Sequence, residues 1–180
     1  PKTAWPPTWY YSTTGRGHTV FAQVFEGMDQ AEKIDRLTIN GSRIMLLEMP
    51  FRMWRQKDID QVRNLIEERK FSLIIAHLER FMKTAGNKEY IEELMSLPVT
   101  IQINAESLSD WKQSHTLIKM FKRGQAHILG SDCHGIHHRP PNLMEGRQIL
   151  GKKAGEACIR RLDEYGVDLL QQIKNDKMQE

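Results

Sequence analysis

The feature that most constrains the fold is a regular alternation of short apolar runs and amphipathic segments between residues 43 and 130. In the amphipathic segments apolar residues recur at helical spacing, as Ile59, Val62 and Ile66 do. Strands that alternate with helices form a parallel sheet or barrel with the helices outside. The predicted strands are residues 43–48, 71–76, 99–103 and 126–130, and the predicted helices are residues 58–70, 88–97, 109–123 and most of 143–177.

Residues 109–123 show the helical pattern with a marked apolar face. Trp111, Leu117, Ile118 and Phe121 lie on this face, and we expect their side chains to point into the core. Gly124 follows directly and is placed to end the helix, because glycine readily adopts the left-handed conformation found after a last helical turn. The pattern predicts a helix that ends sharply before the last strand.

The composition is that of one soluble globular domain. The chain has 180 residues, enough for one good core, and its net charge of +3 is spread without a basic run. We therefore expect no nucleic-acid partner. Two cysteines do not make a disulfide framework, and no apolar stretch is long enough to span a membrane, so a cytoplasmic location is expected. Residues 1–20 are predicted to form a tail or loop, and residues 21–180 the folded domain.

Polar side chains stand at the ends of all four predicted strands. Glu48 ends the first strand, His77 follows the second, and Asn104 follows the third. Asp132 and His134 follow the fourth, and alternate residues of an extended chain point the same way. Because the carboxyl ends of parallel strands gather on one face, we expect these side chains to meet there. A mixed set of carboxylates and imidazoles suits manganese, iron or zinc, so the pattern predicts that Glu48, His77, Asp132 and His134 ligate a divalent metal.

Two arginines and several polar residues would complete such a site. Arg80 and Arg139 each follow a predicted ligand closely and can hold phosphate oxygens. Asn104 and Ser131 can support the ligands as outer hydrogen-bond partners, and His138 can face the site from its loop. A metal-activated water together with an arginine clamp is suited to phosphoester hydrolysis.

Taken singly, these residues have simpler interpretations. His77 alone could be a buried structural histidine, and Arg80 could pair with Glu79. The segment from Cys133 to Arg139 also has the pattern C-x5-R of cysteine-dependent tyrosine phosphatases. That chemistry needs backbone N–H groups that cradle the phosphate, whereas here the loop is bulky and prolines without an N–H follow it. We therefore expect Cys133 to face the core as a bystander.

Four stretches carry a resemblance to a known family. They are LTINGSRIMLLEMPF at 37–51, IIAHLERF at 74–81, IQINAESL at 101–108 and HILGSDCHGIHHRPPNL at 127–143. In order and spacing they resemble the PHP-domain metal-dependent phosphoesterases. The likeness is to the bacterial protein-tyrosine phosphatases of the CpsB and YwqE type, which act in capsule and exopolysaccharide biosynthesis.

The resemblance implies an α/β fold, namely a distorted TIM-like (β/α)7 barrel of the PHP type, here lacking its first βα units. It implies the metal ligands and phosphate-binding arginines named above, with manganese, iron or zinc as the cofactor. The implied activity is a metal-dependent protein-tyrosine phosphatase. The implied substrate is phosphotyrosine on a protein, in particular on the tail of a tyrosine autokinase of polysaccharide export.

Two features depart from the family pattern. The family opens with a strand that carries His-x-His, whereas the one histidine before His77 in this chain is His18. The family also has a metal-binding glutamate before the 37–51 stretch, and Gln23 stands near that place. Residues 17–35 are similar to a cyclophilin segment, although the rest of such a prolyl isomerase is absent. A catalytically impaired remnant that binds phosphate and a prolyl-isomerase fragment therefore stay open as alternatives. An incomplete barrel would expose a sheet edge, which favours a homo-oligomer.

Overall fold

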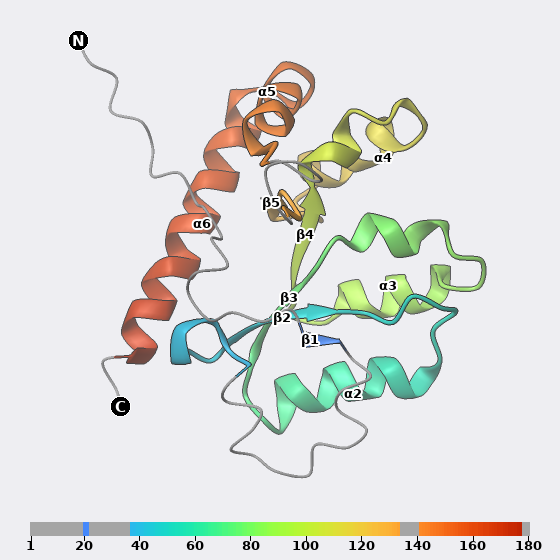
Figure 1. Ribbon diagram of the computed structural model, residues 1–180, viewed down its shortest axis with the longest axis vertical. Helices are drawn as coiled ribbons and strands as arrows, with labels where there is room; N and C mark the ends of the chain where they lie inside the picture. Colours follow the sequence, from blue (N-terminus) through green and yellow to red (C-terminus); the bar gives the residue numbers. More distant parts are fainter. Residues whose placement is uncertain (1–19, 22–36, 134–140, 178–180) are drawn as a thin grey trace.

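The computed structural model describes residues 20–21, 37–133 and 141–177, and its centre is a sheet of parallel strands (Figure 1). Each strand lies beside its neighbours in the sequence, which confirms the predicted α/β fold with a parallel sheet. In spatial order the strands are β1 (Val20–Phe21), β2 (Ile44–Glu48), β3 (Ser72–Ile75), β4 (Thr100–Asn104) and β5 (Ile128–Gly130).

The expected closed barrel is not seen among the described residues. Their sheet is open, with β1 and β5 as its two edges. A barrel closes when its first and last strands pair, and five strands fall short of the seven or more that the barrel prediction requires. The described part of the chain is therefore an open α/β sheet.

Helices follow β2, β3, β4 and β5 in the order that the sequence pattern predicts. The α-helices are α2 (Gln56–Glu67), α3 (Lys88–Ser96), α4 (Trp111–Lys122), α5 (Leu143–Ala154) and α6 (Glu156–Lys177). The sequence pattern did not predict the short 3-10 helices, which are η2 (Ile39–Gly41), η3 (Leu78–Lys83) and η4 (Ala105–Leu108). Both η3 and η4 begin within a few residues of a strand end, so they belong to the edge where functional residues are expected.

The sheet has a core on each face because its apolar residues alternate. Met45 and Leu47 of β2 belong to the larger cluster, to which helices α2 to α5 and the first turn of α6 contribute. Ile44 of the same strand belongs to a smaller cluster on the opposite face, together with Leu169 and Ile173 of α6. Figure 1 shows α6 lying along one side of the sheet, away from α2, α3 and α4. Two layers of helices thus sandwich the sheet.

Helix α4 confirms most of its predicted apolar face and corrects one residue. Leu117, Ile118 and Phe121 are buried, and Gly124 ends the helix in a left-handed conformation with φ of 69°. Trp111, which was expected to point inward, is 81% exposed. It is the first residue of the helix, where the side chain projects beyond the turns that pack on the sheet, and Lys112 Nζ lies 5.7 Å from the centre of its ring. The helical period alone does not show where burial begins.

Cys133 is half-buried, so it does not sit in the core as expected. Among the described residues, no helix combines the length and the apolar character that crossing a membrane requires.

Candidate functional site

The parallel register brings the predicted strand-end residues to one edge of the sheet. Leu47 of β2 pairs with Ile75 of β3, so Glu48 at the end of β2 lies level with the residues that follow β3. Asn104 is the last residue of β4 and pairs with Gly130, the last residue of β5. His77 and Asp132 each follow their strands by two residues. The carboxyl ends of these strands therefore form the candidate site.

Glu48 and His77 form a close buried pair. Glu48 Oε1 lies 2.9 Å from His77 Nε2, and the two residues are 7% and 5% exposed. Two donor atoms that each lie about 2.1 Å from one metal ion, at right angles around it, are about 3.0 Å apart. The pair therefore fits two adjacent positions of a divalent ion that accepts nitrogen and oxygen ligands.

Two predicted metal ligands have left-handed backbones. His77 has φ of 34° and ψ of 53°, and Asp132 has φ of 48°. Residues other than glycine rarely adopt this conformation, which costs on the order of 1–3 kcal/mol and is concentrated at functional sites. At both positions the turn directs the chain sharply away from the strand end. Asn40 and Lys70, which precede β2 and β3, also have positive φ, so the conformation alone does not single out this edge.

Arg80 joins the two loops of the site. Its backbone N–H donates to the carbonyl oxygen of His77, at 3.0 Å, and its guanidinium forms an ion pair with the carboxylate of Asp132. Both side chains are partly buried. The loop after β3 is therefore tied to the loop after β5. A positive group that can bind a phosphate lies on the same turn as His77.

Asp132 is accordingly bound to an arginine in this structure. Within residues 20–21, 37–133 and 141–177, no three His, Cys, Asp or Glu side chains are grouped so that they could hold a metal ion. The structure brings Glu48 and His77 together, and it brings Arg80 and Asp132 together. The predicted roles of all four residues stay predictions.

Glu79 is a buried residue of the site that the sequence patterns did not single out. It is 1% exposed, and its Oε1 accepts hydrogen bonds from Ser107 Oγ, at 3.0 Å, and from the backbone N–H of Asn104, at 3.3 Å. Burial raises the pKa of Glu79 above its ordinary value, although hydrogen bonds from its own backbone, Ser107 and Asn104 act in the opposite direction. Glu79 thus fastens η3 to the end of β4. In the sequence Glu79 stands between Leu78 and Arg80, and this position indicated only a local ion pair with Arg80, not a buried residue of the site.

A shallow pocket lies beside Arg80 at the end of β4. Its volume is about 250 Å³, and its lining is entirely polar or charged: Arg80, Asn104, Glu106, Ser107, Asp110 and Gln113. Asn104, which was expected to support a metal ligand, accepts a hydrogen bond at Oδ1 from Gln102 Nε2, at 3.2 Å. The pocket gives Arg80 an open side from which a polar ligand can reach it.

The His77 ring belongs to a cluster of four aromatic rings, with Phe51, Phe81 and Trp54. Phe51 lies in the loop after β2, and its ring centre is 6.0 Å from that of His77 and 5.0 Å from that of Phe81. Trp54 packs on Phe81 at 5.4 Å. Phe51 is 60% exposed, whereas the other three rings are buried. The sequence patterns missed Phe51, because one exposed aromatic after a proline has no periodicity.

Of the remaining predicted site residues, one lies in the described part of the chain. Ser131 is half-buried next to Gly130, at the end of β5. His134, His138, Arg139 and Gln23 lie outside the described residues. Their proposed roles as fourth metal ligand, loop histidine, second phosphate-binding arginine and replaced ligand therefore remain predictions.

Comparison with known proteins identifies relatives. The chain is 26% identical over 152 residues to the tyrosine-protein phosphatase CpsB of Streptococcus pneumoniae, a match that covers 78% of this chain and 62% of the relative. It is 26% identical over 134 residues to the protein of the same name from Streptococcus agalactiae serotype III, with 69% and 54% covered. The chain thus spans less than two thirds of the length of these relatives.

A solved structure shares the fold. It comes from a set that comprises YwqE of Bacillus subtilis and CpsB of Streptococcus pneumoniae, which are described as unique metal-dependent tyrosine phosphatases. The TM-score is 0.64 at 19% identity, and the match covers 85% of this chain and 62% of the other. At this identity the likeness establishes the common fold.

A family model for capsular polysaccharide synthesis proteins, CpsB/CapC, matches residues 16–166. The match includes residues 17–35, the stretch that is similar to a cyclophilin segment, as well as all four motif stretches. It extends over most of the chain and agrees with the predicted resemblance. This protein therefore belongs to the CpsB/CapC family.

Proposed function

We propose that this protein is a metal-dependent phosphatase that hydrolyses phosphotyrosine in proteins. The observation that carries the proposal is the buried Glu48–His77 pair at 2.9 Å, whose histidine shares a turn with Arg80, in a member of the CpsB/CapC family. The names of the relatives, which are tyrosine-protein phosphatases, support the substrate class.

Glu48 and His77 would hold one divalent ion, and Asp132 and His134 are the proposed further ligands. The mixture of oxygen and nitrogen donors suits manganese, iron or zinc. When bound, such an ion would supply an activated water and positive charge beside the phosphoryl group. Asn104 and Ser131 are proposed to support the ligands from outside.

Arg80 is the group of this chain that would bind the phosphate. Its guanidinium now pairs with Asp132, so an incoming phosphate would compete with that carboxylate for the same donors. Arg139 is proposed as the second arginine of the clamp. With both arginines on the phosphate, Asp132 would be released from its ion pair and could turn toward the proposed metal position.

The finer parts of the proposal follow the family resemblance. We propose that the fold belongs to a PHP-type, TIM-like barrel, of which residues 21–180 form part, and that residues 1–20 form a tail or loop. The proposed substrate is phosphotyrosine on the tail of a tyrosine autokinase of polysaccharide export, and the proposed location is the cytoplasm. A homo-oligomer is proposed because the sheet of the described residues has two open edges.

The test is hydrolysis of a phosphotyrosine peptide by the full chain with manganese. We expect activity that is lost with a chelator and restored by metal, and that falls about 100-fold or more in His77→Gln, since this change removes a metal ligand. His115→Gln, a change of an exposed histidine on α4, is the matched control and should keep full activity. Cys133→Ser should also remain active. Activity that ignores chelators but disappears in Cys133→Ser would overturn the proposal in favour of cysteine chemistry.

A second candidate is a phosphate-binding module without catalysis. The observation in its favour is that the described residues hold no group of three metal-ligating side chains. Elemental analysis of the purified chain after incubation with manganese discriminates between the two. About one metal ion per chain supports the phosphatase, and no bound metal with retained phosphate binding supports the module.

A further inference from the structure

Phe51 is an exposed aromatic ring fixed beside the Glu48–His77 pair. We propose that it is a specificity residue, on whose ring the phenyl group of an aryl phosphate packs while the phosphate reaches Arg80. This inference rests on the proposed function and names a residue that would favour aryl over alkyl phosphate esters. Single exposed apolar residues are common on proteins, so the case depends on what surrounds this ring.

The first argument is the geometry of the rings. Phe51 and His77 are nearly parallel, with 26° between their planes and 6.0 Å between their centres. Phe81 lies 5.0 Å from Phe51 and 5.8 Å from His77, so it supports both from behind. Since His77 and Phe81 are buried, the 60% exposed Phe51 offers the free aromatic surface of this cluster. An aromatic ring can pack at about 4.5–7 Å from the centre of the Phe51 ring, which itself lies 6.0 Å from the ring of the proposed metal ligand His77.

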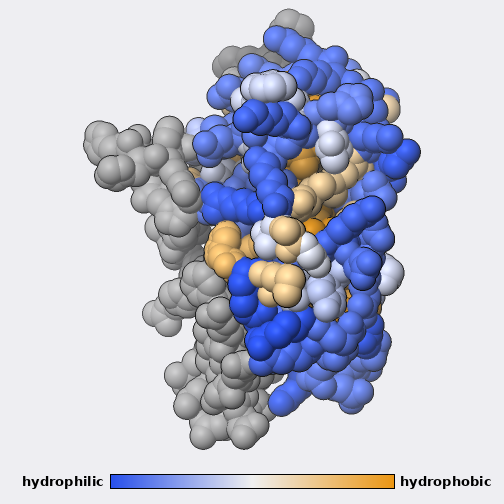
Figure 2. Space-filling view, turned by 90° about the vertical axis from the view of Figure 1, so that its right-hand side faces the viewer, coloured by the Kyte–Doolittle hydropathy of each residue, from blue (hydrophilic) through white to orange (hydrophobic). Residues whose placement is uncertain are grey.

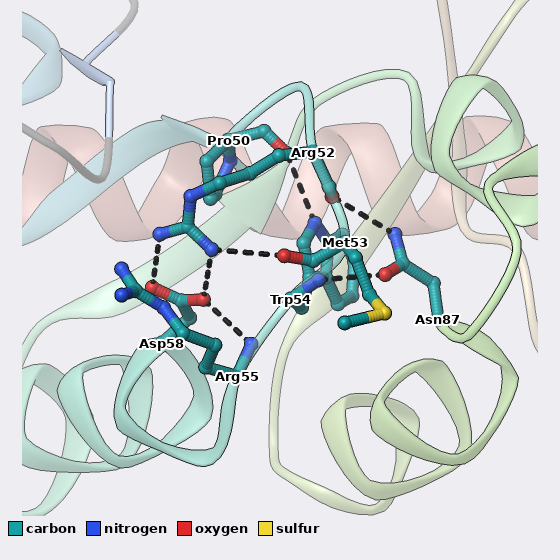
Figure 3. A network of polar contacts seen from close by, with 7 residues as sticks. All are labelled: Pro50, Arg52, Met53, Trp54, Arg55, Asp58 and Asn87. Atoms are coloured by element: carbon teal, nitrogen blue, oxygen red, sulfur yellow. Dashed lines mark hydrogen bonds and ion pairs between the residues drawn. The ribbon is translucent and has the colours of Figure 1, made fainter.

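The second argument is the rigidity of the loop that carries Phe51. Arg52 donates two hydrogen bonds to the carboxylate of Asp58, at 2.7 and 2.8 Å, and Asp58 also accepts the backbone N–H of Arg55, at 2.8 Å (Figure 3). Asn87 accepts the backbone N–H of Trp54, at 2.7 Å, and is itself fully buried. A ring held by such a loop loses little conformational entropy when a ligand packs on it.

Trp54 closes the same loop from inside. Its indole N–H donates to the carbonyl oxygen of Pro50, at 3.1 Å, and its side chain is fully buried. Met53 lies over Gly86, where a Cβ atom would come within 2.6 Å of the sulfur. The loop is therefore fastened to α2 through Asp58 and to the turn before α3 through Asn87 and Gly86. It nevertheless leaves Phe51 and Met53 60% and 58% exposed.

The third argument is the position on the surface. The loop after β2 extends to the right-hand side of the molecule in Figure 1, and this side faces the viewer in Figure 2. The face is mainly hydrophilic, and hydrophobic residues reach the surface near its centre (Figure 2). An apolar platform within a polar face suits a ligand with one apolar ring and one charged group. Phosphotyrosine has this character, because its phosphate is attached directly to the ring, whereas phosphoserine has no ring to pack.

The experiment measures binding of phenylphosphonate and methylphosphonate to the full chain by calorimetry, with manganese present. Neither compound can be hydrolysed, so the readout does not depend on turnover. We expect phenylphosphonate to bind about tenfold more tightly than methylphosphonate, as one aromatic contact with its buried area allows. In Phe51→Ala the preference should fall to about twofold or less, with the affinity for methylphosphonate unchanged, because the phosphate contacts remain.

Three further variants serve as controls for the role of the Phe51 ring. Phe51→Tyr keeps the ring and should keep the preference for phenylphosphonate, whereas Phe51→Leu keeps apolar bulk without the ring and should lose most of it. Trp111→Ala removes another exposed aromatic, one without a ring contact to His77 among the described residues, and should change neither affinity.

An undiminished preference in Phe51→Ala, an equal loss for both phosphonates, or no binding of either compound overturns the inference. A different outcome would contradict the proposed function and leave the role of Phe51 intact. A chain that shows the ring-dependent preference but does not hydrolyse a phosphotyrosine peptide supports the platform and overturns the phosphatase. If the Phe51→Ala variant hydrolyses the peptide as well as the wild type does, the phosphatase is supported and the role of Phe51 is overturned.

Discussion

Asp58 is the residue that holds the loop after β2 in place. Its carboxylate is 3% exposed and accepts two hydrogen bonds from Arg52 and one from the backbone of Arg55. We expect Asp58→Asn to lower the free energy of unfolding by about 1.5–3 kcal/mol at pH 7, the usual range for hydrogen bonds to a charged group. Urea unfolding measures the change. Asp60→Asn, two residues further along α2 and 55% exposed at its side chain, should change it by less than about 0.5 kcal/mol.

The same carboxylate makes this difference depend on pH. Burial raises the pKa of Asp58, but the hydrogen bonds from Arg52 and Arg55 outweigh it and leave the pKa below the ordinary 3.8. Because the folded pKa lies below the unfolded one, Asp58 stabilises the fold above about pH 3.8 and ceases to do so as the pH falls through the folded pKa. The gap in stability between the wild type and Asp58→Asn should therefore shrink below pH 4. A gap that stays constant down to pH 2.5 would show that charge is not its source.

At this scale the sequence predicted where four polar residues of the candidate site lie, at the strand ends, while their roles stay predictions. Glu48, His77, Arg80 and Asp132 stand next to apolar runs, so the pattern of the strands locates them. Their pairing could not be predicted, since the contact of Arg80 with Asp132 joins loops that are 52 residues apart. Phe51 and Glu79 carry no pattern of their own. Their significance comes from neighbours that only the folded chain brings near.

The elements were predicted well where burial follows a period and poorly elsewhere. Strands β2 to β5 and helices α2 to α6 appear in the predicted order, because alternating and helical periods report which face is buried. Strand β1 is two residues long, too short for any period. Whether the sheet is open depends on which strands pair, and the local sequence pattern of a strand does not show its pairing partner.

His127 joins β5 to β4 and contacts α6. Its Nδ1 accepts the backbone N–H of Ile101, at 2.8 Å, and its ring stacks on Tyr165 of α6 at 4.9 Å. Burial lowers the pKa of His127 below 6.5, although a hydrogen bond with the backbone of Gly124 acts in the opposite direction. The neutral ring is therefore the stabilising form. Its contribution is complete above about pH 6.5 and is lost as the pH falls through the folded pKa.

We accordingly expect His127→Ala to cost about 1–3 kcal/mol at pH 7.5, because the buried N–H of Ile101 loses its acceptor. The variant should also lose less stability than the wild type between pH 6.5 and pH 5. Urea unfolding at several pH values measures both effects. His115→Ala, on the exposed face of α4, is the control and should follow the wild type. Parallel pH profiles for wild type and His127→Ala would contradict the proposed role of the neutral ring.

Helix α6 covers the second face of the sheet with few residues. Leu169 and Ile173 are 8% and 7% exposed, and they pack in one small cluster with Ile44, Ile74 and Ile128. We expect Ile173→Ala to lower the free energy of unfolding by about 2–4 kcal/mol, since it leaves a cavity between helix and sheet. Val167→Ala, at a 40% exposed position of the same helix, should change it by less than about 0.5 kcal/mol. A small effect of Ile173→Ala would mean that α6 contributes little to the fold.

At the scale of the whole molecule, the described chain combines a well-packed sheet with open edges. The edge strands β1 and β5 are two and three residues long, so each leaves few backbone groups unpaired. The candidate site lies at the carboxyl ends of the strands, where it borders β2, β3, β4 and β5 at once. Binding there should therefore stabilise the sheet as a unit.

This reasoning leads to a prediction for metal binding. An ion that binds the folded chain alone stabilises it by about 2.7 kcal/mol when its concentration is 100 times its Kd, which corresponds to a rise in Tm of about 5–10 °C for a domain of this size. We expect such a rise with manganese or zinc, and its reversal by a chelator, in differential scanning calorimetry. His77→Gln should abolish most of the rise, because it removes one of the two donors that lie 2.9 Å apart. His115→Gln should retain it. A rise of equal size in both variants would place the bound metal elsewhere on the molecule and would leave the Glu48–His77 pair as a structural contact.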